Sequence, residues 1–146
     1  MRRTCAPAAA MLSVFASFGL VLATNSPAFA ADEWRSDWLG DDVYMNLIRD
    51  GDLRGSGYFR ADPVGSASGD SFQACDNYAD GKGMEVSRKF NGSSTWKVMA
   101  STRGHSAGYC TPNITDNMAE GTYLAVRLCI VEGTHQTCGP EKWTTA

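Results

Sequence analysis

The stretch Thr122–Ala146, with the sequence TYLAVRLCIVEGTHQTCGPEKWTTA, contains the clearest strand pattern in the chain and a closely spaced pair of cysteines. Apolar residues alternate along its first half, which predicts a β-strand with one buried aliphatic face. If Gly133-Thr134 forms a two-residue turn, Cys129 lies opposite Cys138 and within disulfide reach. A longer turn would place the two cysteines diagonally or apart. The stretch therefore predicts a disulfide-linked β-hairpin, and the residues expected on its core face are Leu124, Val126, Leu128 and Ile130.

The start of the chain is typical of a secretory signal peptide. Arg2 and Arg3 precede an apolar run over residues 8–22, and Ala28-Phe29-Ala30 has the small-x-small pattern of a cleavage site. Removal of residues 1–30 would leave one domain of ordinary size. No later stretch approaches the roughly 20 apolar residues that a membrane helix needs. We therefore expect a secreted, extracellular protein that has no membrane association in its mature form.

The net charge limits which classes of partner the mature protein can bind, and the cysteine content predicts its disulfides. Loss of the two signal-peptide arginines takes the 13 basic residues to 11 against 16 acidic ones, a net charge of −5. Such a charge disfavours nucleic acid and anionic membranes as partners. Cleavage also removes Cys5 and leaves an even set of four cysteines, as in disulfide-linked secreted domains. Four cysteines allow three pairings, and the hairpin argument favours Cys75–Cys110 with Cys129–Cys138.

Short alternating segments separated by turn residues predict the rest of the fold. Residues 84–90 and 95–101, with Asn91-Gly92 at the start of their connection, predict a second hairpin. Arg88 shares its inward face, so it either sits at the end of the sheet or pairs with an acid. The side chains expected to point inward are Met84, Val86, Phe90, Trp96, Val98 and Ala100, and further strand candidates are residues 43–48, 56–60 and 71–75. We expect an all-β fold: a single small antiparallel β-sandwich, immunoglobulin-like in architecture, with about seven strands and two disulfides.

The segment before this sandwich is acidic and rich in aromatic residues. Residues 31–42 are predicted to form an N-terminal tail, and residues 43–146 the sandwich domain. Two interpretations stay open for its tryptophans: they cap one end of the core, or they anchor a segment that docks on another protein. The candidate partner-binding residues are Trp34, Trp38, Leu39, Asp41 and Asp42.

Residues 76–81 partly match a calcium-binding loop. Asp76, Asp80 and Gly81 fall at the first, fifth and sixth positions of an EF-hand loop, but Tyr78 and Ser87 occupy the third and twelfth. A tight turn stabilised by Asp and Asn side chains accounts for the same residues. Asp76 and Asp80 are therefore the candidate metal ligands, and we expect no metal site and no cofactor.

Evidence for catalysis is sparse. His105 lies in a loop beside Ser106, but Gly-His-Ser is not a nucleophile elbow, and His135 falls on the terminal turn. A surface histidine is more often a solvated side chain than a catalytic or metal-binding one. We therefore expect a protein that is not an enzyme.

The mature chain also resembles a large group of small exported proteins of streptomycetes and related actinobacteria, from about Ser71 to the C-terminus. The resemblance is carried by Ala74-Cys75-Asp76, Ala79-Asp80-Gly81, Tyr109-Cys110, Ala119-Glu120-Gly121-Thr122, Val126-Arg127-Leu128-Cys129, Cys138 and Trp143. It implies a two-disulfide β-sandwich. Some proteins of this kind act as the small adaptor subunit of secreted umbrella-type antibacterial toxin particles, where they bridge a lectin subunit to the toxin stalk.

Three function classes compete. The favoured interpretation is a secreted, non-enzymatic protein–protein interaction module that docks through its N-terminal segment, as an adaptor subunit of an extracellular assembly would. The first alternative is a carbohydrate-binding module, in which exposed tryptophans stack on sugar rings. The second is a small hydrolase or an inhibitor of one, although a chain of this length leaves little room for a deep cleft. The tryptophans considered for a sugar platform are Trp34, Trp38, Trp96 and Trp143.

Overall fold

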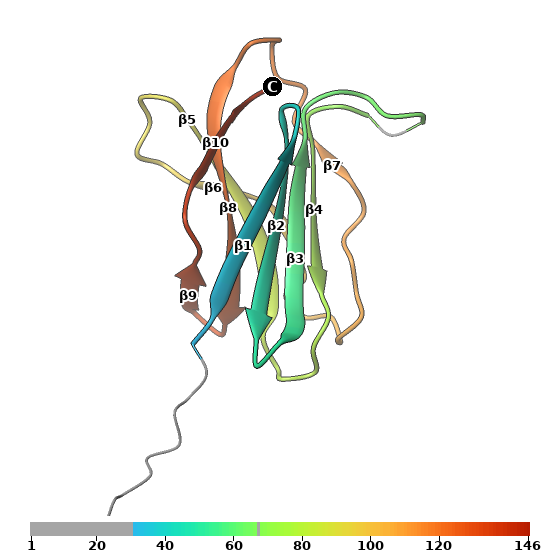
Figure 1. The fold of residues 1–146 in the computed structure, drawn as a ribbon, viewed down its shortest axis with the longest axis vertical. Helices are drawn as coiled ribbons and strands as arrows, with labels where there is room; N and C mark the ends of the chain where they lie inside the picture. The colour runs from blue at the N-terminus through green and yellow to red at the C-terminus, as the bar shows by residue number, and fades with distance from the viewer. Residues whose placement is uncertain (1–30, 67) are drawn as a thin grey trace, which may run out of the picture.

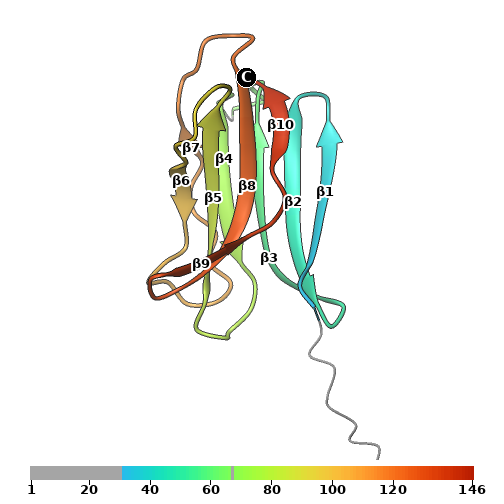
Figure 2. The ribbon, with the colours of Figure 1, turned by 90° about the vertical axis from the view of Figure 1, so that its left-hand side faces the viewer.

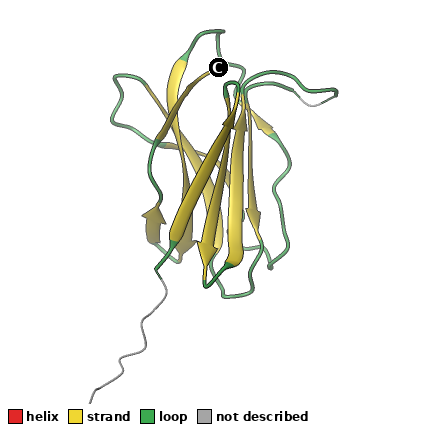
Figure 3. Cartoon of the chain, in the orientation of Figure 1, coloured by secondary structure: helices red, strands yellow, loops and turns green. Residues whose placement is uncertain are grey.

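The structure, a computed structural model, describes residues 31–66 and 68–146, so the predicted signal peptide lies outside the described residues. In these two ranges the chain forms ten β-strands, arranged as two antiparallel sheets packed face to face (Figures 1 and 3). The described part of the chain contains no helix with the length and apolar character needed to cross a membrane. The predicted all-β sandwich with two disulfides is confirmed.

Each sheet is built from five strands. The first has the order β1-β2-β3-β4-β7; the second has the order β10-β8-β5-β6, and β9 pairs with β8 as well. The strands of the first sheet are β1 (Glu33–Leu39), β2 (Asp42–Arg49), β3 (Asp52–Arg60), β4 (Ser71–Asp76) and β7 (Ile114–Thr115). Those of the second are β5 (Gly83–Phe90), β6 (Lys97–Ser101), β8 (Tyr123–Glu132), β9 (His135–Cys138) and β10 (Lys142–Thr145).

The long strand β8 occupies the middle of the second sheet, as its sequence pattern predicts. Its four alternating aliphatic side chains are buried in the core. Glu132 pairs with His135 and Cys129 with Cys138, so the two-residue turn and the disulfide register are both confirmed. The second disulfide, Cys75–Cys110, ties the loop before β7 to β4.

The predicted inward face of the β5–β6 hairpin is correct only in part. Met84, Val86 and Ala100 are buried in the core, but Val98 is 48% exposed. The register shifts between Val86 and Ser87, so Val98 falls opposite Ser87 on the outer face and Met99 becomes buried. Such a β-bulge reverses the alternation on one side of it, here toward the start of β6, which explains why Trp96 does not enter the core either. Phe90 was also predicted inward, but it lies at the end of β5 and is partly exposed.

Two glycines allow the sheets to approach closely at β3. Gly55 and Gly57 are buried beside Phe59 on the inner face of this strand. A Cβ atom on Gly57 would overlap Val86 Cγ2 and would lie 2.9 Å from Leu128 Cδ1. At these two positions the backbone of β3 packs directly against side chains of the second sheet.

Arg88 resolves one of the open alternatives. It is buried on the inner face of β5, where its guanidinium forms an ion pair with Asp116, and Lys97 Nζ lies 2.9 Å from the same carboxylate. The ring of Phe90 packs against the guanidinium at 3.9 Å. Arg88 is therefore paired with an acid close to the end of its strand.

Candidate functional site

The segment predicted as an N-terminal tail is instead an ordered edge strand. β1 pairs antiparallel with β2 along seven consecutive residues, from Glu33 opposite Ile48 to Leu39 opposite Asp42. The sandwich therefore begins near Glu33 rather than at Val43, because the Gly40-Asp41 turn folds the acidic segment back onto β2. Within the described residues no strand pairs with the other edge of β1, and Figure 2 shows β1 as the outermost strand on its side.

Trp34 closes the side of the sandwich between β1 and β10. Its ring packs against the hydrophobic core and lies so close to Gly139 that a Cβ there would meet the indole. Met45 and Leu128 line the same place, where only about 10 Å³ stays empty. Trp34 therefore caps the core, which was one of the two interpretations of the N-terminal tryptophans.

Trp38 and Leu39 lie at the other end of β1 and are accessible. Trp38 is 51% exposed, and Lys142 Nζ lies 5.2 Å from the centre of its ring. Leu39 is 72% exposed, although leucine is among the residues most often found inside proteins. The two side chains are neighbours in the strand and therefore point to opposite faces of the sheet, so each face has an exposed apolar group at the free edge, next to the turn that leads into β2.

The two predicted partner-binding acids differ in their surroundings. Asp41 is exposed in the turn, where its carbonyl oxygen accepts a hydrogen bond from Thr144 Oγ1. Asp42 is buried, and its Oδ1 accepts the N–H of Ala61 at 2.9 Å. Asp42 therefore holds β2 to the end of β3, whereas Asp41 is free to meet a partner.

The outer face of β1 carries charges of both signs. Glu33 Oε1 and Arg35 Nε lie 2.7 Å apart, and more than half of each side chain is exposed. This contact lowers the pKa of Glu33 and raises that of Arg35. Asp37 follows on the same face, because alternate residues of a strand point to the same side.

Asp76 and Asp80 each stabilise a local turn. Asp76 Oδ1 accepts the N–H of Tyr78, and Asp80 Oδ1 accepts the N–H of Lys82, both at 3.1 Å. Burial raises the pKa of Asp76, the backbone hydrogen bond opposes the rise, and nearby Asp80 adds to it. No cluster of three or more His, Cys, Asp or Glu side chains suited to a metal ion occurs in residues 31–66 and 68–146. The hydrogen bonds of Asp76 and Asp80 are those expected of side chains that stabilise tight turns.

The two histidines occupy different surfaces. His105 stacks on Tyr109, with ring centres 3.7 Å apart and an angle of 9° between the rings. It lines an open cavity of about 330 Å³ together with backbone from the β8–β9 turn. His135 is exposed on β9. Neither histidine hydrogen-bonds to a serine or an acid among the described residues, so no nucleophile–base pair is formed there.

The outer face of the second sheet carries a ladder of aromatic and cationic side chains. Lys89 Nζ lies 4.9 Å from the ring centre of Trp96 and 5.4 Å from that of Trp143. Arg127 covers Trp96 at 4.0 Å, and Tyr123 stacks on Trp143 at 5.2 Å. These rings already pack on side chains of their own sheet, which reduces the surface that a sugar ring could use. The carbohydrate-binding alternative stays a prediction.

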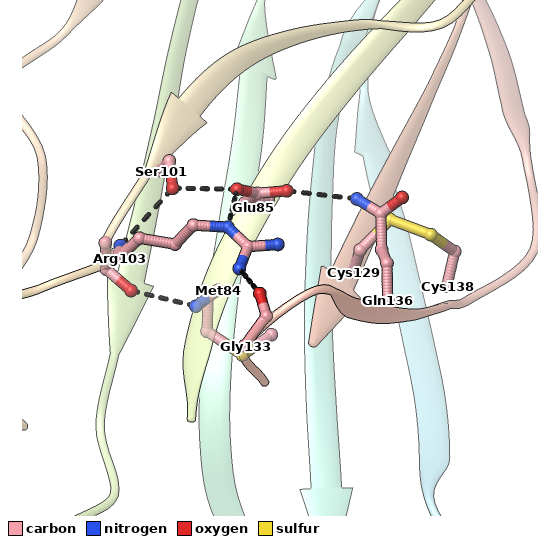
Figure 4. Close-up of polar contacts among 9 residues, drawn as sticks. Met84, Glu85, Ser101, Arg103, Cys129, Gly133, Gln136 and Cys138 are labelled. Atoms are coloured by element: carbon pink, nitrogen blue, oxygen red, sulfur yellow. Dashed lines mark hydrogen bonds and ion pairs between the residues drawn. A yellow bond between two sulfur atoms is a disulfide. The ribbon is translucent and has the colours of Figure 1, made fainter. Parts of the chain in front are cut away.

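A buried carboxylate on this face was missed by sequence reasoning. Glu85 Oε1 accepts hydrogen bonds from Ser101 Oγ at 2.9 Å and Arg103 Nε at 2.6 Å, and Oε2 accepts one from Gln136 Nε2 at 3.0 Å (Figure 4). Arg103 also donates to the carbonyl oxygen of Gly133. Alternation along β5 places Glu85 on the outer face, but no local signal shows that side chains from β6 and β9 cover it. The contacts of Glu85 fasten the β8–β9 turn to the sheet and leave neither oxygen without a partner.

Comparison with known proteins identifies no relative. No protein-family model matches the chain, and no curated protein or solved structure matches it significantly.

Proposed function

We propose that this protein is a secreted, non-enzymatic interaction module that docks on another extracellular protein through the free edge of β1. The observation that carries the proposal is the position of Trp38 and Leu39, two exposed apolar side chains at the end of an edge strand whose outer side has no strand partner in the described residues. An exposed strand edge accepts an added strand through its backbone groups, and neighbouring apolar side chains give such contacts specificity.

The rest of the described molecule supports a binding role rather than catalysis. Asp76 and Asp80 are engaged in turns, His105 stacks on Tyr109, and both oxygens of the buried Glu85 accept hydrogen bonds. Two disulfides and a small core make a rigid scaffold, which suits a module that presents a fixed surface. The adaptor role that the streptomycete resemblance implies fits this use of β1, with another subunit of a secreted assembly as the partner.

The test is a comparison of two matched variants. The mature protein carries an affinity tag at its C-terminus and captures its partner from the culture fluid of the producing organism. The purified partner is then titrated with wild type, with Trp38→Ala/Leu39→Ser, and with Leu53→Ser as the control. Leu53 is 45% exposed at the start of β3, away from the β1–β2 turn.

We expect the Trp38/Leu39 variant to bind at least tenfold more weakly, since truncation of an aromatic anchor that is buried on binding costs about 2 kcal/mol or more. The Leu53 variant should bind as the wild type does. Equal affinity of all three proteins would refute docking through β1. Secretion is tested separately, by N-terminal sequencing of the protein from culture fluid, which should begin at Ala31.

A further inference from the structure

The five central residues of β1, from Trp34 to Trp38, are complementary to themselves when the strand is reversed. The seven residues of β1 are Glu-Trp-Arg-Ser-Asp-Trp-Leu, with Ser36 at the centre. Trp34 and Trp38 lie at equal distances from Ser36, and so do Arg35 and Asp37. A strand of this kind can therefore face a second copy of itself with aromatic residues opposite aromatic residues and a cation opposite an anion.

The edge of β1 has few of the features that usually block pairing between strands, and its charged residues Glu33, Arg35 and Asp37 carry both signs. Edge strands are commonly protected by proline, by a bulge, by charged side chains, above all lysine, or by being very short. β1 has neither proline nor lysine, and its seven-residue pairing with β2 shows no register shift. No strand lies beside its other edge in the described residues. The strand is regular enough to serve as a template for another strand.

Only one symmetric register pairs the full length of β1 and also matches the charges. In an antiparallel pair related by a two-fold axis through Ser36, Arg35 lies opposite Asp37 of the second copy, and this pair occurs twice. A shift of the axis to Arg35 or to Asp37 places like charges opposite each other, which is destabilising. Registers between these positions would join the outer face of one sheet to the inner face of the other, because alternate residues point to opposite faces.

The charged and apolar groups needed for this register are accessible. Arg35 contacts Glu33 within its own chain, but their side chains are 59% and 55% exposed, and exposed ion pairs exchange partners at little cost. On the inner face, half-exposed Trp38 would come beside Trp34 of the second copy. Charge complementarity and apolar contact therefore favour the same alignment.

We propose that β1 pairs antiparallel with β1 of a second copy of this chain about a two-fold axis at Ser36, so that two five-stranded sheets become one continuous sheet. This inference rests on the proposed use of the β1 edge for docking. It adds that, in the absence of a partner, the β1 edge of one copy is covered by β1 of a second copy. Self-pairing and binding of another protein therefore exclude each other.

The first experiment traps the register. Directly opposed strand residues have Cα atoms about 4.5–5.5 Å apart, within disulfide reach. Ser36→Cys in the mature protein should therefore give a disulfide-linked dimer under mild oxidation. Leu39→Cys is the control, because residue 39 lies opposite Glu33 in this register, so two cysteines at position 39 would be far apart while both Arg35–Asp37 pairs are kept. Peptide mapping confirms that the four native cysteines keep their pairings. Equal cross-linking of both variants, or none of Ser36→Cys, overturns the register.

The second experiment uses charge exchange and sedimentation velocity. Arg35→Asp alone and Asp37→Arg alone each put like charges opposite each other, so both should weaken the dimer at least tenfold. The double variant Arg35→Asp/Asp37→Arg restores opposite charges and should recover the dimer. An equimolar mixture of the two single variants should form a heterodimer. A wild type that stays monomeric at every concentration, or a double variant as weak as the single variants, overturns the inference.

These outcomes separate the two proposals. If the wild type is monomeric but the Trp38/Leu39 variant still loses its protein partner, only self-pairing fails. If the dimer forms as expected and partner binding is insensitive to every β1 variant, only the proposed function fails. If dimerisation and partner binding are both real, excess partner should dissociate the dimer in the same sedimentation experiment.

Discussion

Gly57→Ala tests how closely the two sheets approach at β3. The added methyl group would overlap Val86 Cγ2, lie 2.9 Å from Leu128 Cδ1 and lie 3.2 Å from the carbonyl oxygen of Gln73. Val86 and Leu128 are buried in β5 and β8, and a β-branched valine has little freedom to change its rotamer. Overpacking a well-packed core costs about 1–3 kcal/mol. Since three groups resist the new methyl, we expect the free energy of unfolding to fall by about 2–3 kcal/mol.

Gly55→Ala is the matched control on the same strand. The three atoms that its Cβ would meet most closely all belong to the side chain of Met84, including Sδ at 2.5 Å and Cε at 2.9 Å. A methionine side chain has three rotatable bonds and adapts to an irregular space. The expected cost is therefore about 1 kcal/mol, clearly below that of Gly57→Ala.

A double-mutant cycle then identifies the contact responsible. Val86→Ala removes both methyl groups at the overlap and should by itself cost about 2 kcal/mol through the cavity that it leaves. Combined with Gly57→Ala, it should restore part of the packing, with a favourable coupling of about 1–2 kcal/mol. The assay is equilibrium unfolding in urea, followed by tryptophan fluorescence with both disulfides intact. Strictly additive costs, or equal costs at Gly55 and Gly57, would refute the explanation.

Three further predictions concern buried charges and cross-links. Asp116→Asn should lower the free energy of unfolding at neutral pH by about 3 kcal/mol, because it leaves Arg88 buried without a counter-charge. Burial raises the pKa of Asp116, but hydrogen bonds from Lys97 and Arg88 lower it by more, so its folded-state pKa lies below the ordinary 3.8. The stability that ionised Asp116 contributes is therefore fully present above its unfolded-state pKa. The difference in free energy of unfolding between wild type and variant, measured in urea, should disappear as pH falls through the folded-state pKa. Asp76→Asn should have the opposite effect, because burial raises the pKa of Asp76. The wild type therefore loses stability as pH rises from 3.8 through the folded-state pKa. The variant should lack this loss, so thermal melts at neutral pH should show it to be more stable than the wild type. Cys129→Ala with Cys138→Ala opens a link of sequence separation 9 and should cost about 2.6 kcal/mol on the chain-entropy model, measured in urea against the oxidised wild type.

The parts of the fold that could be predicted are those whose signals are local. β8 has ten residues with a buried alternating face, and its turn brings two cysteines together in one register. Each feature is set by side chains within a few residues, so the hairpin and its disulfide follow from the sequence. The remaining disulfide then follows by elimination, as the structure confirms.

β1 was misassigned because its evidence is not local. Its residues are acidic and aromatic and lack an aliphatic face, which is also typical of a solvated tail. What makes the segment a strand is the turn at Gly40-Asp41 and the contact between Trp34 and Gly139, which is more than 100 positions away in the chain. A pattern within seven residues cannot show that contact.

The bulge in the β5–β6 hairpin and the burial of Glu85 were missed for the same physical reason. A register shift between Val86 and Ser87 depends on how two strands fit, and it sends Val98 outward. Glu85 looks like an ordinary exposed acid in the sequence, but Arg103 from the turn after β6 and Gln136 from β9 cover it. Of the candidate partner-binding residues, Trp38 and Leu39 are accessible, although on an ordered strand, whereas Asp42 is buried; their role in binding stays a prediction.

The order of β1 changes what docking through it would involve. A mobile tail must lose conformational entropy when it binds, at a cost of about 1–2 kcal/mol for each residue that becomes fixed. β1 is already held along its length by β2, and Trp34 fixes its first half to the core. Near its far end, Lys142 of the second sheet lies beside the ring of Trp38, and Thr144 donates a hydrogen bond to the carbonyl oxygen of Asp41 in the adjoining turn. A partner strand could therefore engage this end without disturbing the core, and without the ordering cost that the sequence alone would assign to it.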